Sequence, residues 1–150
     1  MKKRVAIVVG TVGLVVFLVA GVAFARVITA TSGSDNISAT NNADNIAASA
    51  NRDVVNGKGA ADRIFGDGGN DTLDGGGGTD HIESGDGDNV ARGNEGDGDW
   101  VSVVDNDTND FVSGGEGTED VCVVDLINGV RDEFSDTCEK VYQTASIPQE

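Results

Sequence analysis

The chain has 150 residues, with 26 acidic and 10 basic side chains, a formal net charge of −16, 22 glycines and one proline. This length allows one modest domain and excludes a multidomain organisation. The excess of acid argues against a nucleic-acid partner, because binding to a duplex needs Lys and Arg to displace counterions from phosphates. Binding to an anionic membrane surface is disfavoured for the same reason.

Residues 1–25 are expected to be a secretory signal peptide. Lys2, Lys3 and Arg4 precede an apolar run over residues 5–22, which ends at the small-residue site Ala23-Phe24-Ala25. The alternative is an uncleaved membrane anchor, but four Gly and Thr residues dilute the run. Cleavage would leave a secreted protein, free in the extracellular space or held at the cell surface, with no further membrane contact and a net charge of −19 once those three basic residues are lost.

The remaining chain is acidic and poor in apolar residues, a composition that ordinarily predicts disorder because burial cannot offset chain entropy. Folding therefore needs a further source of free energy. One candidate is a cation that neutralises the carboxylates, and another is a disulfide between the only two cysteines, Cys122 and Cys138. Export favours the disulfide, and two free thiols are the alternative.

An aspartate recurs every nine residues from residue 35 to residue 80, and an aliphatic residue follows two places after each. This period predicts stacked repeats that each contribute one inward apolar side chain. The aspartates are Asp35, Asp44, Asp53, Asp62, Asp71 and Asp80, and the aliphatic residues are Ile37, Ile46, Val55, Ile64, Leu73 and Ile82.

Glycines complete the pattern at residues 66–74 (GDGGNDTLD) and 75–83 (GGGGTDHIE), which fit GGxGxDxUx, where U is aliphatic. Glycines let carbonyl oxygens converge without side-chain clashes. Calcium takes six to eight oxygen ligands, more than one short loop easily provides but a number that two stacked loops can provide. Residues 30 to about 122 resemble the repeats-in-toxin, or haemolysin-type, calcium-binding family.

This resemblance implies an all-β fold, a parallel β-roll in which two nonapeptides form one coil. Like turns then recur in every second nonapeptide and share calcium ions. The expected organisation is a signal peptide at 1–25, a repeat domain at 26–121 and a C-terminal cap and tail at 122–150. Turns 57–62 and 75–80 form the best predicted site. The expected metal ligands are Asp53, Gly57, Gly59, Asp62, Gly66, Gly68, Asp71, Gly75, Gly77, Asp80, Asp88 and Asp99.

The pattern weakens towards both ends. The early turns begin with Ala30, Ala39 and Ala48 in place of glycine, and we expect them to bind calcium weakly or not at all. After Glu83 the register is expected to slip by one residue, which places Asp88 in the ligand position. Near the C-terminus Glu119 takes this sixth place, which puts calcium binding there in doubt.

Residues 105–116 have a second interpretation, as an EF-hand loop with acids or amides at places one, three and five and Glu at place twelve. Its sixth place needs glycine and holds Asp110, and the flanks lack helical periodicity, so the repeat interpretation is preferred.

The cap is expected to cover the last coil with Leu126, Ile127, Phe134 and Tyr142. Trp100 falls at a register break, where we expect a hydrophobic plug, and His81 is expected to point outward from a strand.

The preferred function is that of an exported calcium-binding protein whose repeats fold on extracellular calcium. The alternative is a calcium-rigidified surface adhesion or structural module that binds a glycan or a cell-surface partner, although no single residue type recurs on the outward positions. We do not expect an enzyme, because calcium ligation explains the carboxylates collectively and no pair of them is singled out. No glycine motif for phosphate occurs.

Overall fold

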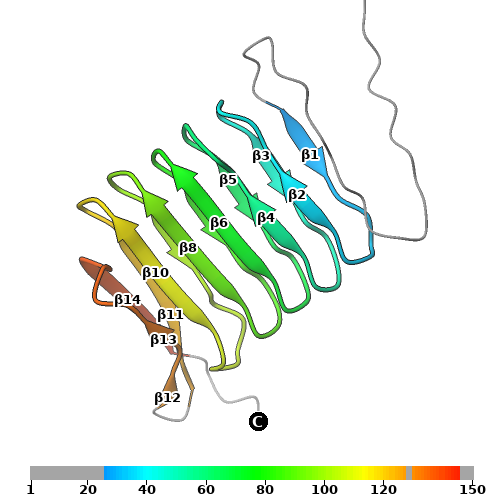
Figure 1. Cartoon of the computed structure of the whole chain (residues 1–150). Coiled ribbons are helices and arrows are strands. Elements are labelled where there is room, and N and C mark those ends of the chain that lie inside the picture. The colour runs from blue at the N-terminus through cyan, green and yellow to red at the C-terminus, as the bar shows by residue number, and fades with distance from the viewer. Residues whose placement is uncertain (1–25, 128–129, 146–150) are drawn as a thin grey trace, which may run out of the picture.

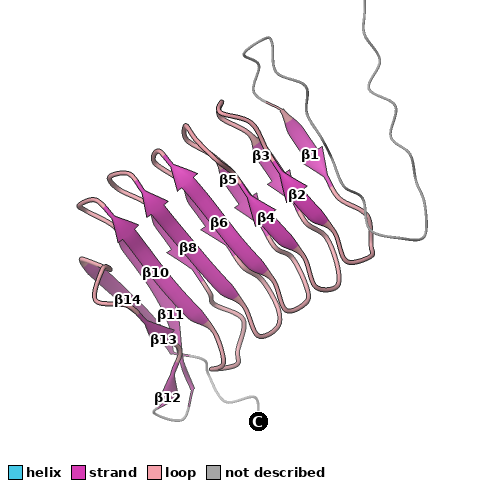
Figure 2. Cartoon of the chain, viewed as in Figure 1, coloured by secondary structure: helices cyan, strands magenta, loops and turns pink. Residues whose placement is uncertain are grey.

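A computed structural model provides the structure of the protein and describes residues 26–127 and 130–145. The predicted signal peptide lies outside the described residues, as do residues 146–150 of the predicted tail. Within the described ranges the chain forms strands and turns, and no helix has the length and hydropathy needed to cross a membrane. Figure 2 shows these short strands and the loops that join them.

The strands form two sheets that are stacked coil upon coil into a parallel β-solenoid of about six turns, which confirms the predicted fold class (Figure 1). From β1 to β11 the odd-numbered strands lie in one sheet and the even-numbered strands in the other, and the pairing is parallel except between β11 and β12. The first sheet contains β1 (Val27–Thr29), β3 (Asn45–Ala47), β5 (Arg63–Phe65), β7 (His81–Glu83), β9 (Trp100–Ser102), β11 (Val121–Ile127) and β12 (Val130–Arg131), with β14 (Lys140–Ala145) paired to β11. The second contains β2 (Asn36–Ser38), β4 (Val54–Asn56), β6 (Thr72–Gly77), β8 (Val90–Glu95), β10 (Phe111–Glu116) and β13 (Glu133–Phe134).

The core is one row of apolar side chains from each sheet, because the middle residue of each three-residue strand points inward. Ile46 pairs with Ile64, and Ile64 with Ile82, so each coil consists of two nonapeptides, as predicted. This interior is thin, since each coil adds only one residue per sheet to these rows, and the core outside them includes only a few further side chains, among them Ala39, Ala48, Val103 and Val124. The two rows are Ile28, Ile46, Ile64, Ile82, Val101 and Cys122 in the first sheet, and Ile37, Val55, Leu73, Ala91 and Val112 in the second.

The turns between strands reverse the chain through residues with positive φ at the second and fourth places of the nonapeptide. Gly76 (φ 100°) and Gly78 (φ 142°) do this in one turn, and Lys58 (φ 78°) and Ala60 (φ 72°) do it one coil earlier. Glycine adopts this region without steric cost, whereas Lys and Ala adopt it only at a steric cost. Asn51 (φ 72°) also adopts it in the fourth place, in agreement with the sequence-based expectation.

The predicted slip of register after Glu83 is wrong. β8 pairs with β6 at the regular spacing of one coil, Ala91 opposite Leu73, so Asn89 rather than Asp88 follows Asp71 in the stack. Asp88 is exposed, one place before the buried position. The first extra residue comes later, because His81 pairs with Trp100 rather than with Asp99, where an unbroken repeat would have placed the partner.

The C-terminal strands end the stack and are tied to it covalently. Cys122 in β11 and Cys138 before β14 form the predicted disulfide, with Cα atoms 5.7 Å apart. Phe134 and Val141 pack against the core, whereas Tyr142 is 59% exposed and does not cover the last coil as predicted.

Candidate metal-binding turns

Each turn places one side chain, almost always an aspartate, under the backbone of the preceding coil. Oδ1 of Asp62 accepts the backbone N–H of Asp44, and Oδ1 of Asp80 accepts that of Asp62, at 2.7 and 2.8 Å. The same bond repeats along both edges of the stack at 2.6 to 2.9 Å. We call the edge with Asp44, Asp62, Asp80, Asp99 and Asp120 the Asp62 row, and the edge with Asp35, Asp53, Asp71, Asn89, Asp110 and Asp132 the Asp71 row.

The second oxygen of most of these carboxylates is buried and has no hydrogen-bond partner. Burying an acceptor without a partner costs free energy, and burying an unpaired charge costs more. A native fold therefore needs a proton or a cation at these oxygens. The atoms are Oδ2 of Asp53, Asp62, Asp71, Asp80, Asp99, Asp110 and Asp120, and Oδ1 of Asp132.

The electrostatics of the rows point the same way. Burial, together with the neighbouring carboxylates of the row, raises the pKa of Asp62 and of Asp99 from 3.8 to about 7, although backbone hydrogen bonds oppose the shift. Burial likewise raises the pKa of Asp71 to about 6. A site that stabilises the neutral form of a carboxyl also rewards a bound cation, since both neutralise the charge.

Backbone carbonyls converge on the same places. A Cβ atom added to Gly57 would lie 2.4 Å from the carbonyl oxygen of Gly75 and 2.6 Å from Oδ2 of Asp62. At Gly75 it would lie 2.4 Å from Oδ2 of Asp80 and 2.9 Å from the carbonyl oxygen of Gly93. A side chain here would therefore fill a space that is walled by a carboxylate of one coil and a carbonyl of the next.

The predicted pair of turns does stack. Gly59 and Gly77, in the third places of turns 57–62 and 75–80, form a parallel bridge. Gly66 has the same surroundings as Gly57, with the carbonyl oxygen of Ser84 and Oδ2 of Asp71. Gly68 instead has open space around it, since nothing lies within 4 Å of an added Cβ atom.

The first two turns are closed by threonine rather than left open. The backbone N–H and the hydroxyl of Thr31 both donate to Oδ2 of Asp35, at 2.7 and 2.8 Å. Thr40 makes the same two bonds to Oδ2 of Asp44. These Oδ2 atoms already have protein partners, so the open oxygens begin only with the third aspartate. The sequence analysis did not assign this role to the threonines, although both stand four residues before their aspartate.

Two further assignments are corrected by the structure. Asn89 interrupts the Asp71 row, and its amide nitrogen donates to the carbonyl of Gly85 at 2.8 Å, which leaves no open oxygen. At the C-terminal end Asp120, fully buried, holds the place that was assigned to Glu119, which is exposed with φ of 70°. Asp99 is buried in the Asp62 row. That row therefore has four consecutive open carboxylates.

Comparison with known families agrees with this geometry. The model of the RTX calcium-binding nonapeptide repeat matches four overlapping copies, at residues 29–60, 48–82, 56–91 and 74–97. Residues 29–97 belong to the RTX calcium-binding nonapeptide repeat family. Comparisons with curated proteins and with solved structures gave no match. The RTX assignment covers the open turns up to Asp80 and ends before Asp99.

The residues of these RTX repeats fit calcium. Carboxylate and carbonyl oxygens are the donors that a hard divalent cation prefers, and no nitrogen or sulfur ligand adjoins the open oxygens of the described turns. The carboxylates of Asp62 and Asp80, with carbonyls near Gly57 and Gly75, would hold the ion. Bound calcium would supply the positive charge that the buried carboxylates lack.

Proposed function

We propose that this protein is exported and that extracellular calcium stabilises its β-solenoid, so that the ion acts as a structural cofactor. The observation that carries the proposal is the set of buried, unpartnered carboxylate oxygens that begins at Asp53 and recurs in both rows, with one interruption at Asn89. Ionised and without a cation, these groups oppose folding, whereas calcium would convert them into cross-links between successive coils. Extracellular calcium modules work at roughly 10⁻⁴ to 10⁻³ M.

Two features support export. The N-terminal segment has the pattern of a signal peptide. The disulfide between Cys122 and Cys138 is of a kind that persists in oxidising compartments. The proposal includes no catalytic activity, because the buried carboxylates lie in regular rows under the backbone rather than in a cleft that could receive a substrate.

A calcium titration followed by chelation tests the proposal, with far-UV circular dichroism as the readout. Strand signal should increase on addition of calcium and decrease with chelator. The variants Asp62→Ala and Asp80→Ala should both weaken the response. Full strand content at neutral pH in the presence of chelator, unchanged by calcium, would contradict the structural role.

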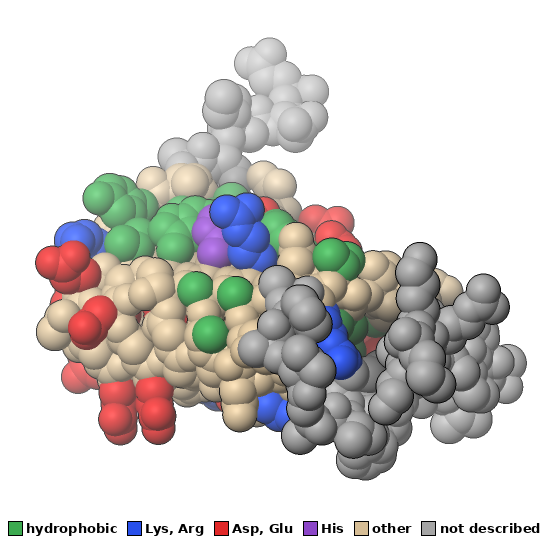
Figure 3. All heavy atoms as spheres, turned by 90° about the horizontal axis from the view of Figure 1, so that it is seen from above, with side chains coloured by type: hydrophobic (Ala, Val, Ile, Leu, Met, Phe, Trp, Pro, Cys, Tyr) green, Lys and Arg blue, Asp and Glu red, His purple; other side chains and the backbone are tan. Residues whose placement is uncertain are grey.

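A second function, glycan binding by a calcium-rigidified surface, has one observation in its favour. Trp100 is not the predicted plug but lies on the outer face of β9, stacked on His81 with ring centroids 4.3 Å apart and planes 9° apart. Phe65 lies beside this pair, and the carboxylate of Glu83 lies 2.9 Å from Nε2 of the His81 ring. Figure 3 shows the single histidine between hydrophobic side chains and a basic side chain.

A groove of about 350 Å³ adjoins this stack and is lined in part by Phe65, Glu83, Trp100 and Val104. An aromatic wall with a nearby carboxylate suits the apolar face and the hydroxyls of a sugar ring. Fluorescence of Trp100, the only tryptophan, reports on this groove directly. Quenching or enhancement by oligosaccharides of a glycan panel that is absent in Phe65→Ala would support this function, and an unchanged spectrum across the panel would exclude it.

A further inference from the structure

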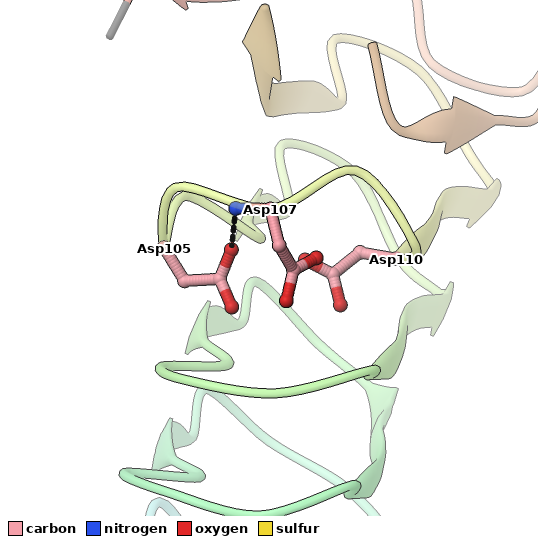
Figure 4. Close-up of side chains that lie close together, drawn as sticks. All are labelled: Asp105, Asp107 and Asp110. Carbon is pink, nitrogen blue, oxygen red and sulfur yellow. Dashed lines mark hydrogen bonds between the residues drawn. The ribbon is translucent and has the colours of Figure 1, made fainter. Parts of the chain in front are cut away.

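We propose a separate calcium site in the turn that joins β9 to β10, formed by the carboxylates of Asp105, Asp107 and Asp110. One carboxylate oxygen from each lies within 4.8 Å of the other two (Figure 4). The turn lies outside residues 29–97, so the repeat assignment does not include it, and the site goes beyond the proposed function of those repeats.

The turn differs in kind from the RTX turns. Residues 103–109 contain no glycine, and the interval from Asp99 to Asp110 is longer than one nonapeptide. The extra length brings Asp105 and Asp107 next to the row position of Asp110. Side-chain carboxylates thus take the place that backbone carbonyls hold beside Asp62 and Asp80.

The cluster has an unsatisfied oxygen at its base. Asp110 is 2% exposed, its Oδ1 accepts the N–H of Asn89 at 2.6 Å, and its Oδ2 has no partner. Figure 4 shows the carboxylate of Asp110 turned towards that of Asp107. A buried acceptor without a donor, facing two more carboxylates, requires a positive charge or a proton.

The neighbouring groups add to the negative charge. Asp132, next in the Asp71 row, also has a buried oxygen without a partner, and Asp125 accepts the N–H groups of Asp105 and Asn106. The only ion pair found among the described residues lies elsewhere, between His81 and Glu83. Asn89 separates this group from the open oxygens of Asp53 and Asp71, so the cluster is not simply the end of the repeat row.

The backbone holds the ligands in place: it donates to both oxygens of Asp105, but to only one oxygen each of Asp107 and Asp110. Asp105 accepts from the N–H of Gly87 and from that of Asp107, both at 2.9 Å, and Asp107 accepts from the N–H of Asn109 at 3.0 Å. The donor set consists of oxygens alone, with no His or Cys, which excludes a zinc-type site and favours calcium. The EF-hand interpretation of residues 105–116 is nevertheless wrong, because Phe111–Glu116 is strand β10 and Glu116, the twelfth residue of the supposed loop, is exposed.

The test is a calcium titration of the ¹⁵N-labelled protein, followed by the amide signals of Asp107 and Asn109 for the turn and of Lys58 and Gly78 for the repeats. Asp107→Asn removes a charge but keeps an oxygen that can accept from Asn109. We expect it to raise the calcium midpoint of the turn amides at least about tenfold, with the repeat amides unchanged. Asp136→Asn, an exposed change outside the cluster, should leave both midpoints unchanged.

The site is refuted if the turn amides of the wild type do not respond while the repeat amides do, or if Asp107→Asn leaves the turn midpoint unaltered. An equal response of the turn to magnesium at the same concentrations would refute the assignment to calcium. Failure of the proposed repeat function would look different, since the Lys58 and Gly78 amides would then be silent whatever the turn does.

Discussion

Replacing Asp62 with asparagine should separate the two roles of this side chain, which are to accept a hydrogen bond and to carry a charge. The asparagine can keep the Oδ1 bond to the N–H of Asp44 but loses the charge at Oδ2. Asn89 shows that the row accepts this residue, because its amide nitrogen finds the carbonyl four residues earlier. Lys58 holds the equivalent place in the turn of Asp62, where its carbonyl oxygen accepts the N–H of Gly77 at 2.8 Å and has a second lone pair for the new amide.

The expected magnitude follows from the burial of the carboxylate. A rise in the pKa of Asp62 from 3.8 to about 7 corresponds to about 4 kcal/mol between the protonation states. We expect about half of this to reappear as added stability of Asp62→Asn at pH 7.5 in chelator, about 2 kcal/mol, because the new amide must also be satisfied. In about 10 mM calcium each wild-type site should add about 1.4 to 2.7 kcal/mol, an increment that the variant should lose.

Asp44→Asn is the matched control. Oδ2 of Asp44 already accepts two hydrogen bonds from Thr40. An amide NH₂ in its place would be a donor opposite the two donors of Thr40, and those bonds would be lost. This variant should lose about 1 to 3 kcal/mol in chelator and keep the full calcium increment. Urea unfolding of the wild type and both variants, followed by circular dichroism with and without calcium, gives the stability change in chelator and the calcium increment of each variant. If Asp62→Asn is destabilised as much as Asp44→Asn and still gains from calcium like the wild type, the charge argument is wrong.

Three other measurements test different parts of the same structure. In chelator the free energy of unfolding should decrease as pH rises from about 4 to 8. Burial raises the folded-state pKa of Asp62 and Asp99 to about 7 and that of Asp110 to about 8, so the folded protein binds more protons than the unfolded chain. Urea titrations at several pH values should show that calcium removes this pH dependence, and a stability maximum at pH 8 without calcium would contradict the prediction. Gly75→Ala should lower the free energy of unfolding by about 1 to 3 kcal/mol, since its Cβ would meet Oδ2 of Asp80 at 2.4 Å. Gly68→Ala, with open space around it, should change the free energy of unfolding, measured by thermal unfolding, by less than about 0.5 kcal/mol. Reduction of the disulfide between Cys122 and Cys138, 16 residues apart, should cost about 3 kcal/mol and raise amide hydrogen exchange in β14 before β5, a difference that equal exchange in both strands would exclude.

The regular part of the stack could be predicted from the sequence because two independent signals agree there. From Asp35 to Ile82 the aspartates and the aliphatic residues keep the same period, so a shift by one residue would break both. At the next repeat the interpretation followed the aspartate and chose Asp88. The structure follows hydrogen-bonding capacity instead, since Asn89 supplies the same Oδ1 acceptor.

The two ends of the stack were harder to predict from the sequence, because the interactions that determine their register and turns are not periodic. Glu119 and Asp120 are adjacent acids, and only the buried Cys122 two places later marks Asp120 as the row residue, a signal that is missed when cysteine is considered only for disulfides. The role of Thr31 depends on where Oδ2 of Asp35 points, which spacing alone does not show. Likewise Trp100 follows an inserted residue, and only the pairing of β9 with β7 places it against His81.

In this solenoid each strand pairs with the strands of adjacent coils, which makes the protein a one-dimensional system. Order then spreads by nearest-neighbour steps, outward from the covalently pinned end and towards the threonine-closed end. We expect the number of ordered coils to increase gradually with calcium concentration. The protein would then respond to calcium in a graded rather than a two-state manner. Adding or deleting one whole coil in the middle would then widen or narrow the range of calcium concentration over which the coils become ordered, with no change at either end of the stack.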